Sequence, residues 1–457
     1  MKKINLLYAL GVALAMGSTV SSHAQELKEF YGRPTNWRAY DQTGINQFET
    51  KKTADIPFEG PRFRIGAGFT QQWQNLKHEN PGSAVKLYPL ASGFMTSQAN
   101  LYTDVQLADG IRLNVTSYLS ARHHNETWVK GGYIQFDKLP FKSAFFNKLM
   151  ENVTVKVGHM EINYGDAHFR RSDGGQTLYN PFADNYIVDA FTTEIGGEAY
   201  YQKNGFIGML GVTGGMIKGN VDSVDGNAMA NGKPVIADKN GNRNPSIYGK
   251  LGYDNKVAEN VRLRVTGSYY HNSSSAGSGL TLYGSQSTGD RTGSNYQEVM
   301  ETASAGTANA WSGRTGPGFS KKLDAAMFNA FVKAGGLEFF GSYENASGYA
   351  KTESVKRHMK QTALDLVYRF GKAENLFVGA RYNTAKIGLA NVTTAPVITY
   401  NGDVTIDRTA FAAGWFLTKS VLLKGEYVTQ KYKDYPTASV FNNGKFNGVV
   451  IEAVVGF

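Results

Sequence analysis

The sequence has no cysteine, only 12 prolines among its 457 residues and, after residue 24, no uninterrupted apolar run long enough to cross a bilayer as a helix. The absence of cysteine excludes a disulfide-stapled fold and a thiol nucleophile. The absence of a long apolar run excludes a bundle of membrane-spanning helices. Hydrophobic residues make up 41% of the chain and charged residues 19%, so the composition also excludes a disordered tail.

Glycine and aromatic residues are abundant instead, with 52 Gly, 26 Tyr and 26 Phe. Aromatic residues favour β-strands, and glycine favours the tight turns that connect them. A chain of this length also buries enough surface to fold without disulfides or a structural metal. The composition therefore predicts a large β-rich protein.

The N-terminus has the pattern of a cleavable export signal. The pair Lys2-Lys3 precedes the apolar stretch Leu6 to Met16, and the small-x-small triplet Ser22-His23-Ala24 follows. An uncleaved helical anchor is the alternative, but the apolar stretch is short for a bilayer. We predict that residues 1–24 form a signal peptide and that the mature protein is exported.

From residue 62 onwards, apolar and polar residues alternate over segments of about ten residues, as in transmembrane β-barrels. In residues 111–119, for example, odd positions are mainly apolar, while even positions are Arg, Asn, Thr and Tyr. The pattern predicts sixteen strands, near residues 62–74, 93–108, 111–122, 126–137, 152–164, 189–202, 206–217, 246–254, 260–273, 325–334, 337–350, 360–371, 376–388, 405–417, 421–433 and 446–457.

The connections between these strands are alternately short and long. A soluble β-sandwich shows the same alternation of side chains, so the strand number and the connection lengths decide the fold class. An even number of strands with tight turns on one side and long loops on the other is typical of outer-membrane barrels. We predict an all-β fold, a transmembrane antiparallel barrel over residues 62–457 with short periplasmic turns and long extracellular loops.

Two segments do not fit the alternation. Residues 25–61 form a predicted periplasmic N-terminal extension, which either packs into the lumen or lies on the surface. Residues 138–151, with Phe141, Phe145 and Phe146, are too long for a tight turn. We expect them to form a peripheral amphipathic turn, with a short helix or a small apolar plug at the rim as the alternatives.

The chain ends in the alternating segment 449–457, with an aromatic residue at the last position, Phe457. This ending resembles the last strand of bacterial outer-membrane β-barrels. Together with the export signal and the sixteen strands, it resembles trimeric porins, including the phosphate-selective type. The resemblance implies the outer membrane of a Gram-negative bacterium, contact with membrane lipid and lipopolysaccharide, and a homotrimer. Export argues against nucleic acid as the partner of the basic chain.

The third long connection, residues 165–188, is the predicted pore constriction. In porins, the loop at this position in the chain folds into the barrel. Arg170 and Arg171 are then the candidates for attracting anions, although adjacent arginines on a loop are often only solvated charges. The acidic residues of the same loop are expected to set a local field across the opening, and they are Asp166, Asp173 and Asp184.

The strand alternation also places a set of arginines on the lumen face, and this predicted charge ladder consists of Arg62, Arg64, Arg112, Arg262, Arg264, Arg369 and Arg381. Arginine favours anions through its charge and its forked geometry. The same parity turns Asp104, Glu338, Asp365, Glu426 and Glu452 inwards. Ion pairing between neighbouring strands is therefore an equal alternative, and only a modest anion preference follows.

Enzyme and metal sites have little support in the sequence. No metalloprotease, P-loop or serine-elbow motif is present. His159 and Glu161 lie two residues apart on a predicted strand, and His123 and His124 lie side by side in a loop. The stretch 238–249 begins like a calcium loop but lacks its glycine and its final glutamate. We therefore predict no catalysis, no metal and no cofactor.

The sequence thus predicts an outer-membrane porin, a passive diffusion channel for small hydrophilic solutes with a modest anion preference. The alternative is a structural or adhesive outer-membrane barrel that binds a partner through its long loops. The longest of these, residues 274–324, is rich in Ser, Gly, Thr and Asn, so we expect it to be an exposed, flexible loop.

Overall fold

The computed structural model describes most of the chain from residue 31 to its end. The described residues are 31–34, 36–52, 56–120, 126–141, 143–214, 225–230, 233–235, 244–273, 282–283, 296–302, 313–350, 353–393 and 396–457. The predicted signal peptide, His123 and His124 lie outside them. The division of the chain into signal, extension and barrel stays a prediction.

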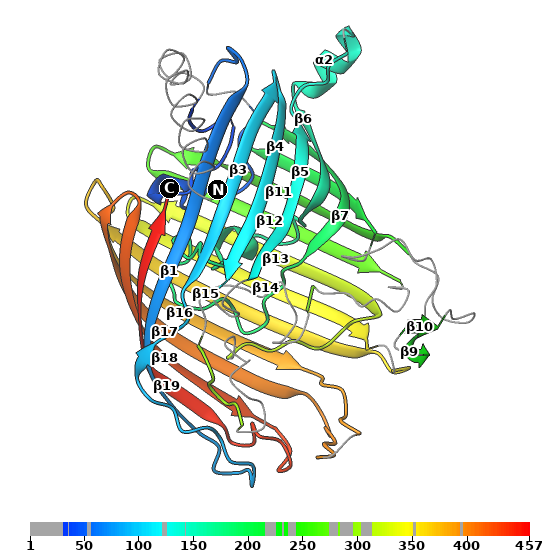
Figure 1. The fold of residues 1–457 in the computed structure, drawn as a ribbon, viewed down its shortest axis with the longest axis vertical. Helices are drawn as coiled ribbons and strands as arrows, with labels where there is room; N and C mark the ends of the chain where they lie inside the picture. Colours follow the sequence, from blue (N-terminus) through cyan, green and yellow to red (C-terminus); the bar gives the residue numbers. More distant parts are fainter. Residues whose placement is uncertain are drawn as a thin grey trace, which may run out of the picture.

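Sixteen strands form one closed antiparallel barrel (Figure 1). Each strand pairs with its neighbours in the chain, and the first strand pairs with the last to close the ring. The barrel strands are β1 (Arg62–Glu79), β3 (Gln98–Ala108), β4 (Ile111–Ser120), β5 (Glu126–Phe136), β6 (Val153–Glu161), β7 (Thr193–Lys203), β8 (Phe206–Thr213), β11 (Ser246–Ala258), β12 (Val261–Asn272), β13 (Lys322–Ala334), β14 (Leu337–Tyr349), β15 (Arg357–Phe370), β16 (Leu376–Ile387), β17 (Val404–Thr418), β18 (Val421–Lys433) and β19 (Lys445–Gly456).

The predicted fold class and strand number are confirmed. The expected strand 93–108 is divided into the short β2 (Gly93–Phe94) and β3, because β1 spans 18 residues and pairs with both along its length. Outside the barrel, β9 (Asp225–Ala230) and β10 (Lys233–Val235) form a separate two-stranded sheet.

Side chains alternate between the two faces of the barrel wall as the sequence predicts. On β15, for example, Leu364, Leu366 and Tyr368 are exposed on the outside, whereas Asp365 and Arg369 are buried on the inside. The outer surface is therefore apolar and suited to lipid, and the inner surface is polar.

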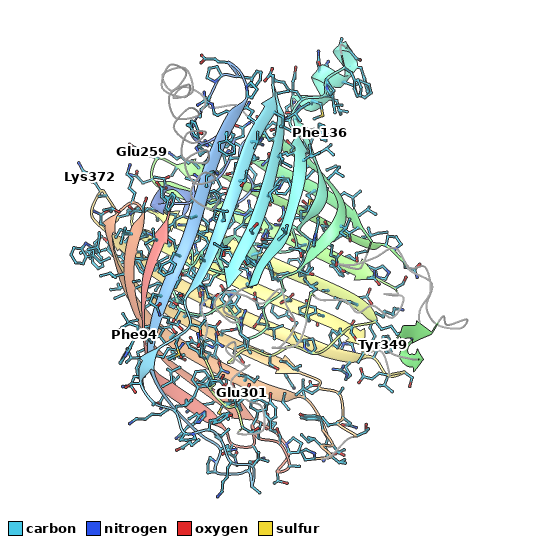
Figure 2. The ribbon with its side chains drawn as sticks, viewed as in Figure 1. Phe94, Phe136, Glu259, Glu301, Tyr349 and Lys372 are labelled. Carbon is cyan, nitrogen blue, oxygen red and sulfur yellow. The ribbon has the colours of Figure 1, made fainter. Side chains whose placement is uncertain are left out.

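The two rims of the barrel differ in their connections. Glu259 and Lys372 mark short turns at one rim, and Tyr349 and Glu301 lie towards the other (Figure 2). The turn between β7 and β8 consists of Asn204-Gly205, and both residues have positive φ, as the tightest hairpin turns require.

The β5–β6 connection contains α2 (Ala144–Met150), at the rim with the short turns. The structure therefore has the short helix that we considered an alternative. It projects beyond the rim (Figure 1), and Phe141 and Phe145 are exposed while Met150 is buried. Among the described residues, the remaining regular elements are two short 3-10 helices, η1 (Gln42–Gly44) and η2 (Ala167–Arg170). Within the described ranges, no helix is long and apolar enough to cross a membrane.

Candidate functional site inside the barrel

The inner wall of the barrel bears buried arginines at the predicted positions. The Arg112 and Arg264 side chains have 1% of their surface exposed, and Arg369 and Arg381 are also buried. Arg64 and Arg262 lie on the same face. The seventh, Arg62, begins β1 and is half-buried. The structure thus places the arginines of the predicted ladder on the lumen side of their strands.

Six of these arginines form ion pairs with carboxylates of the wall or of the segments inside it. The pairs are Arg64 with Asp104, Arg112 with Asp137 at 2.7 Å, Arg262 with Asp254 at 2.6 Å, Arg264 with Asp166 at 2.7 Å, Arg369 with Glu338 at 2.9 Å and Arg381 with Asp365 at 2.7 Å. The ion-paired arrangement that we weighed equally is thus what the structure shows. An anion-selective role for the arginine ladder stays a prediction.

The connection between β6 and β7, which contains the predicted constriction 165–188 and is called the inner loop, lies inside the barrel. Asp166 is fully buried, accepts hydrogen bonds from Arg264 and from Thr266 at 2.7 Å on β12, and pairs with Lys250 of β11 at 2.9 Å. Farther along, Lys424 of β18 donates to the carbonyl of Thr177 at 3.0 Å. Contacts on opposite ends of the loop therefore hold it across the lumen, and Figure 1 shows this coil between the near and far walls.

Arg170 and Arg171 are both buried and both have acidic neighbours. Arg170 donates to Asn46 and lies 3.9 Å from Glu338 on β14. Arg171 pairs with Asp189 at 2.7 Å and with Asp173 at 2.9 Å. The two arginines therefore belong to a charge network inside the barrel and are not simply solvated loop residues.

Asp173 and Asp184 belong to the same network. Asp173 accepts hydrogen bonds from Lys130 of β5 and from Tyr118 of β4, both at 2.5 Å. Asp184 lies 3.2 Å from Arg408 of β17 and 3.5 Å from Arg314. Burial raises the pKa of Asp184 to about 6 in spite of these two guanidinium groups. The pKa of this loop carboxylate therefore lies close to neutral pH.

This raised pKa predicts a pH-dependent selectivity. Below about pH 6, Asp184 is protonated while Arg314 and Arg408 stay charged, so the lumen gains positive charge. We expect the anion-to-cation permeability ratio of the wild-type protein, reconstituted in a planar bilayer, to rise by about twofold between about pH 8 and about pH 5. The Asp184→Asn variant should have the higher ratio throughout, measured by reversal potential in a salt gradient. Asp109→Asn, at an exposed turn, is the matched control, and an unchanged pH profile in Asp184→Asn would contradict the assignment.

The long connection between β12 and β13 also contributes to the interior. Its described residues 282–283, 296–302 and 313–321 are largely buried. Tyr283 donates to Glu344 of β14 at 2.5 Å, and Tyr296 donates to Glu426 of β18 at 2.6 Å. Our expectation of an exposed loop was wrong for these residues, because their aromatic rings pack into the apolar core inside the barrel. Tyr283 and Tyr296 were the available signal within the Ser- and Gly-rich sequence.

The N-terminal segment, residues 31–52, crosses the rim that bears the short turns. Its backbone pairs with Phe63 of β1 through Gly32, and the Gln42 amide donates to the carbonyl of Lys419, in the β17–β18 turn, at 2.8 Å. Farther along, Lys52 lies 3.9 Å from Asp137, which follows β5. Of the two alternatives for the extension, these residues adopt the one inside the barrel.

Glu49 is the main ionic anchor of this segment. Its carboxylate pairs with Arg264 at 2.7 Å and with Lys250 at 3.2 Å, and Asn163 donates to it at 2.9 Å. Burial alone would raise the pKa of Glu49, but the two cations hold the pKa at about 2. The same two cations also pair with Asp166, so the N-terminal segment and the inner loop share one anchor.

A cavity of ≈ 280 Å³ remains between the N-terminal segment, the inner loop and strands β3 to β7. Its lining includes Arg38, Lys130 and Lys156 and several tyrosines. His159 and Glu161 also line the cavity. Glu161 forms an ion pair with Lys130, and its carboxylate oxygen lies 2.5 Å from a ring nitrogen of His168. Burial lowers the pKa of His168, which favours a neutral imidazole.

Metal ligation has no candidate in the part of the chain that the structure describes. No group of three or more His, Asp or Glu side chains there is arranged to hold an ion.

Solved structures that are similar to this chain include porins and outer-membrane proteins, all at low sequence identity. An anion-selective porin from Comamonas acidovorans is 11% identical, with a TM-score of 0.49 over 87% of this chain and 100% of that chain. The trimer form of OmpT from Vibrio cholerae is 10% identical, with a TM-score of 0.48 and the same coverage, 87% and 100%. OpdL from Pseudomonas aeruginosa is 10% identical, with a TM-score of 0.42 over 86% of this chain and 98% of that chain.

No protein-family model matches the sequence, and no curated protein matches it significantly.

Proposed function

We propose that this protein is an outer-membrane channel through which small hydrophilic solutes diffuse passively, with a modest preference for anions. The observation that supports it best is the closed sixteen-strand wall with an apolar outside and a charged inside. A wall of this size is too wide for its own side chains to fill, so its interior holds water or other parts of the chain. Charged groups along such an interior interact with solutes that cross it.

The inner loop is the proposed selectivity element. Arg170 and Arg171 lie within it, between the N-terminal segment and the wall, and their positive charges are balanced locally by Glu338 and Asp189. The proposed location is the outer membrane of a Gram-negative bacterium, where the apolar wall contacts lipid and lipopolysaccharide. We also propose a homotrimer, which chemical crosslinking of the detergent-solubilised protein tests directly.

The first experiment is single-channel recording of the purified protein in a planar bilayer, with reversal potentials measured in a potassium chloride gradient. We expect stepwise conductance and a reversal potential on the anion-selective side. The absence of conductance from a correctly folded barrel would reject the channel function.

Neutralising the two loop arginines should then reverse the preference. In the double variant Arg170→Gln and Arg171→Gln, Glu338 and Asp189 lose a cationic neighbour while keeping their negative charges. We expect the anion-to-cation permeability ratio to fall by about threefold or more. Arg357→Gln is the control, because Arg357 pairs with Glu353 at the rim that bears the long loops. An unchanged permeability ratio in the double variant would contradict a role for the loop arginines and would indicate that the arginines of the wall determine the selectivity.

The adhesive barrel remains the second candidate because of one observation. Three segments of the chain lie inside the barrel, namely the N-terminal segment, the inner loop and the buried residues of the β12–β13 connection. If they block the lumen completely, the long loops are left as the functional surface. The bilayer recording separates the two candidates.

A further inference from the structure

We infer that the ≈ 280 Å³ cavity is a binding site for a small hydroxylated anion of the size of a sugar acid, whose carboxylate binds to Lys156. The volume is at the lower end of the range for ligand pockets, which suits a single ring. The inference rests on the proposed function, because the cavity lies inside the barrel and a solute enters it from the lumen.

Lys156 provides the positive charge of the site. It lies on β6, and its ammonium nitrogen is 4.9 Å from the ring centre of Tyr200 and 5.2 Å from that of Tyr133. Glu198 lies opposite in the β6–β7 register, but its carboxylate accepts hydrogen bonds from Tyr200 and from Tyr248 instead. Within the described ranges, Lys156 has no carboxylate partner.

Arg38 is a second cation of the lining without an acidic partner among the described residues. Its guanidinium lies 3.6 Å from the ring centre of Tyr179 and donates to the carbonyls of Gly44 at 2.8 Å and Phe169 at 2.9 Å. These contacts fix the side chain but leave its charge unbalanced, so the cavity favours a negatively charged occupant.

The carboxylates of the lining are all neutralised by other cations. Glu49 pairs with Lys250 and Arg264, Asp104 with Arg64, Glu161 with Lys130, and Asp173 with Lys130 and Arg171. The positive charges of Lys156 and Arg38 are therefore in excess of the local acids.

The polar groups of the lining suit hydroxyl groups. The Tyr133 hydroxyl, the Gln202 amide and the Thr50 hydroxyl line the cavity and have no hydrogen-bond partner in the portion of the chain that the structure describes. All three residues are half-buried, and an occupant of the cavity would cover them further. Buried polar groups are normally hydrogen-bonded, so a solute with several hydroxyl groups is well matched to this wall. The faces of the surrounding tyrosines suit the apolar side of a sugar ring.

The experiment is isothermal titration of the full-length protein in detergent with D-glucuronate, and with D-glucose as the neutral sugar of the same ring size. We expect saturable binding of D-glucuronate and none of D-glucose. Lys156→Met should weaken D-glucuronate binding about tenfold or more, because it removes one charge-assisted hydrogen bond. Lys156→Arg should keep most of the affinity.

The matched control is Lys360→Met, since Lys360 is an exposed lysine on the outer face of β15. Equal affinity of wild type and Lys156→Met for D-glucuronate would overturn the assignment, and so would the absence of binding to folded wild-type protein. A shift in electrophoretic mobility between unheated and heated samples confirms that each variant is folded. Because titration does not require conduction, a failed binding site and a failed channel function give different results.

Discussion

Deletion of residues 31–52 is expected to raise the single-channel conductance at least about twofold. This segment crosses one mouth of the barrel and is held there by Gln42 on the β17–β18 side and by Glu49 on β11 and β12. The first barrel strand begins only at Arg62, so the wall and its closure should remain intact without the segment. Bilayer recording of the deletion variant and of wild type under identical salt conditions measures the change.

A second variant tests whether the conductance depends on the side-chain contacts of this segment or only on the chain length at this place. Replacement of residues 31–52 by a Gly/Ser sequence of equal length keeps the chain length but removes two side-chain anchors. These are the Gln42 side chain, which donates to the carbonyl of Ala373 at 3.1 Å, and the Glu49 carboxylate. We expect it to conduct like the deletion. If both variants are folded and both conduct like wild type, the segment does not limit the current.

Asp166→Ala is expected to lower the free energy of unfolding by about 3 kcal/mol or more. Asp166 is fully buried and pairs with Arg264 and Lys250. Its removal leaves Lys250 with Glu49, and Arg264 with Glu49 and the more distant Asp254 at 3.2 Å. Breaking a buried ion pair from one side is costly because the remaining charge is poorly solvated. Urea unfolding in detergent or lipid, followed by tryptophan fluorescence, measures the loss.

Asp109→Ala is the matched control for this prediction. Asp109 pairs with Lys138 at 2.6 Å, but the two side chains are 55% and 61% exposed. An exposed pair of this kind contributes at most about 1 kcal/mol. A similar loss of unfolding free energy in the two variants would show that the buried position of Asp166 does not make its ion pairs more stabilising than an exposed pair. We also expect Asp166→Ala to increase conductance, since it frees the start of the inner loop.

The barrel could be predicted from the sequence because its signal is local. Alternation of side chains, as in residues 111–119, is enforced by lipid on one face and polar surroundings on the other, and it is visible within single strands. That the inner loop folds into the barrel was predicted only from its position in the chain. The ion pairs of the loop could not be predicted, because Asp166 and Arg264 are 98 residues apart in the sequence and no spacing rule relates them.

The interior was harder to predict for the same reason. The N-terminal segment lacks any periodic pattern, yet Glu49 reaches Lys250 across the barrel. Tyr283 and Tyr296 lie in a connection whose composition is typical of an exposed loop, and their burial depends on Glu344 and Glu426 from distant strands. The role of Lys156 could not be predicted from the sequence, because it depends on the absence of a nearby carboxylate in the folded structure.

The position of the inner loop in the chain has a consequence for the order of assembly. Several of its partners belong to strands that follow it in the chain, namely Arg264, Arg381, Arg408 and Lys424. These contacts therefore form only when β12, β16, β17 and β18 are in place around the loop, whereas its partners Lys130 and Tyr118 lie on strands that precede it. Pairing of β1 with β19 closes the wall, so the loop is fully enclosed only once the two ends of the sheet have met.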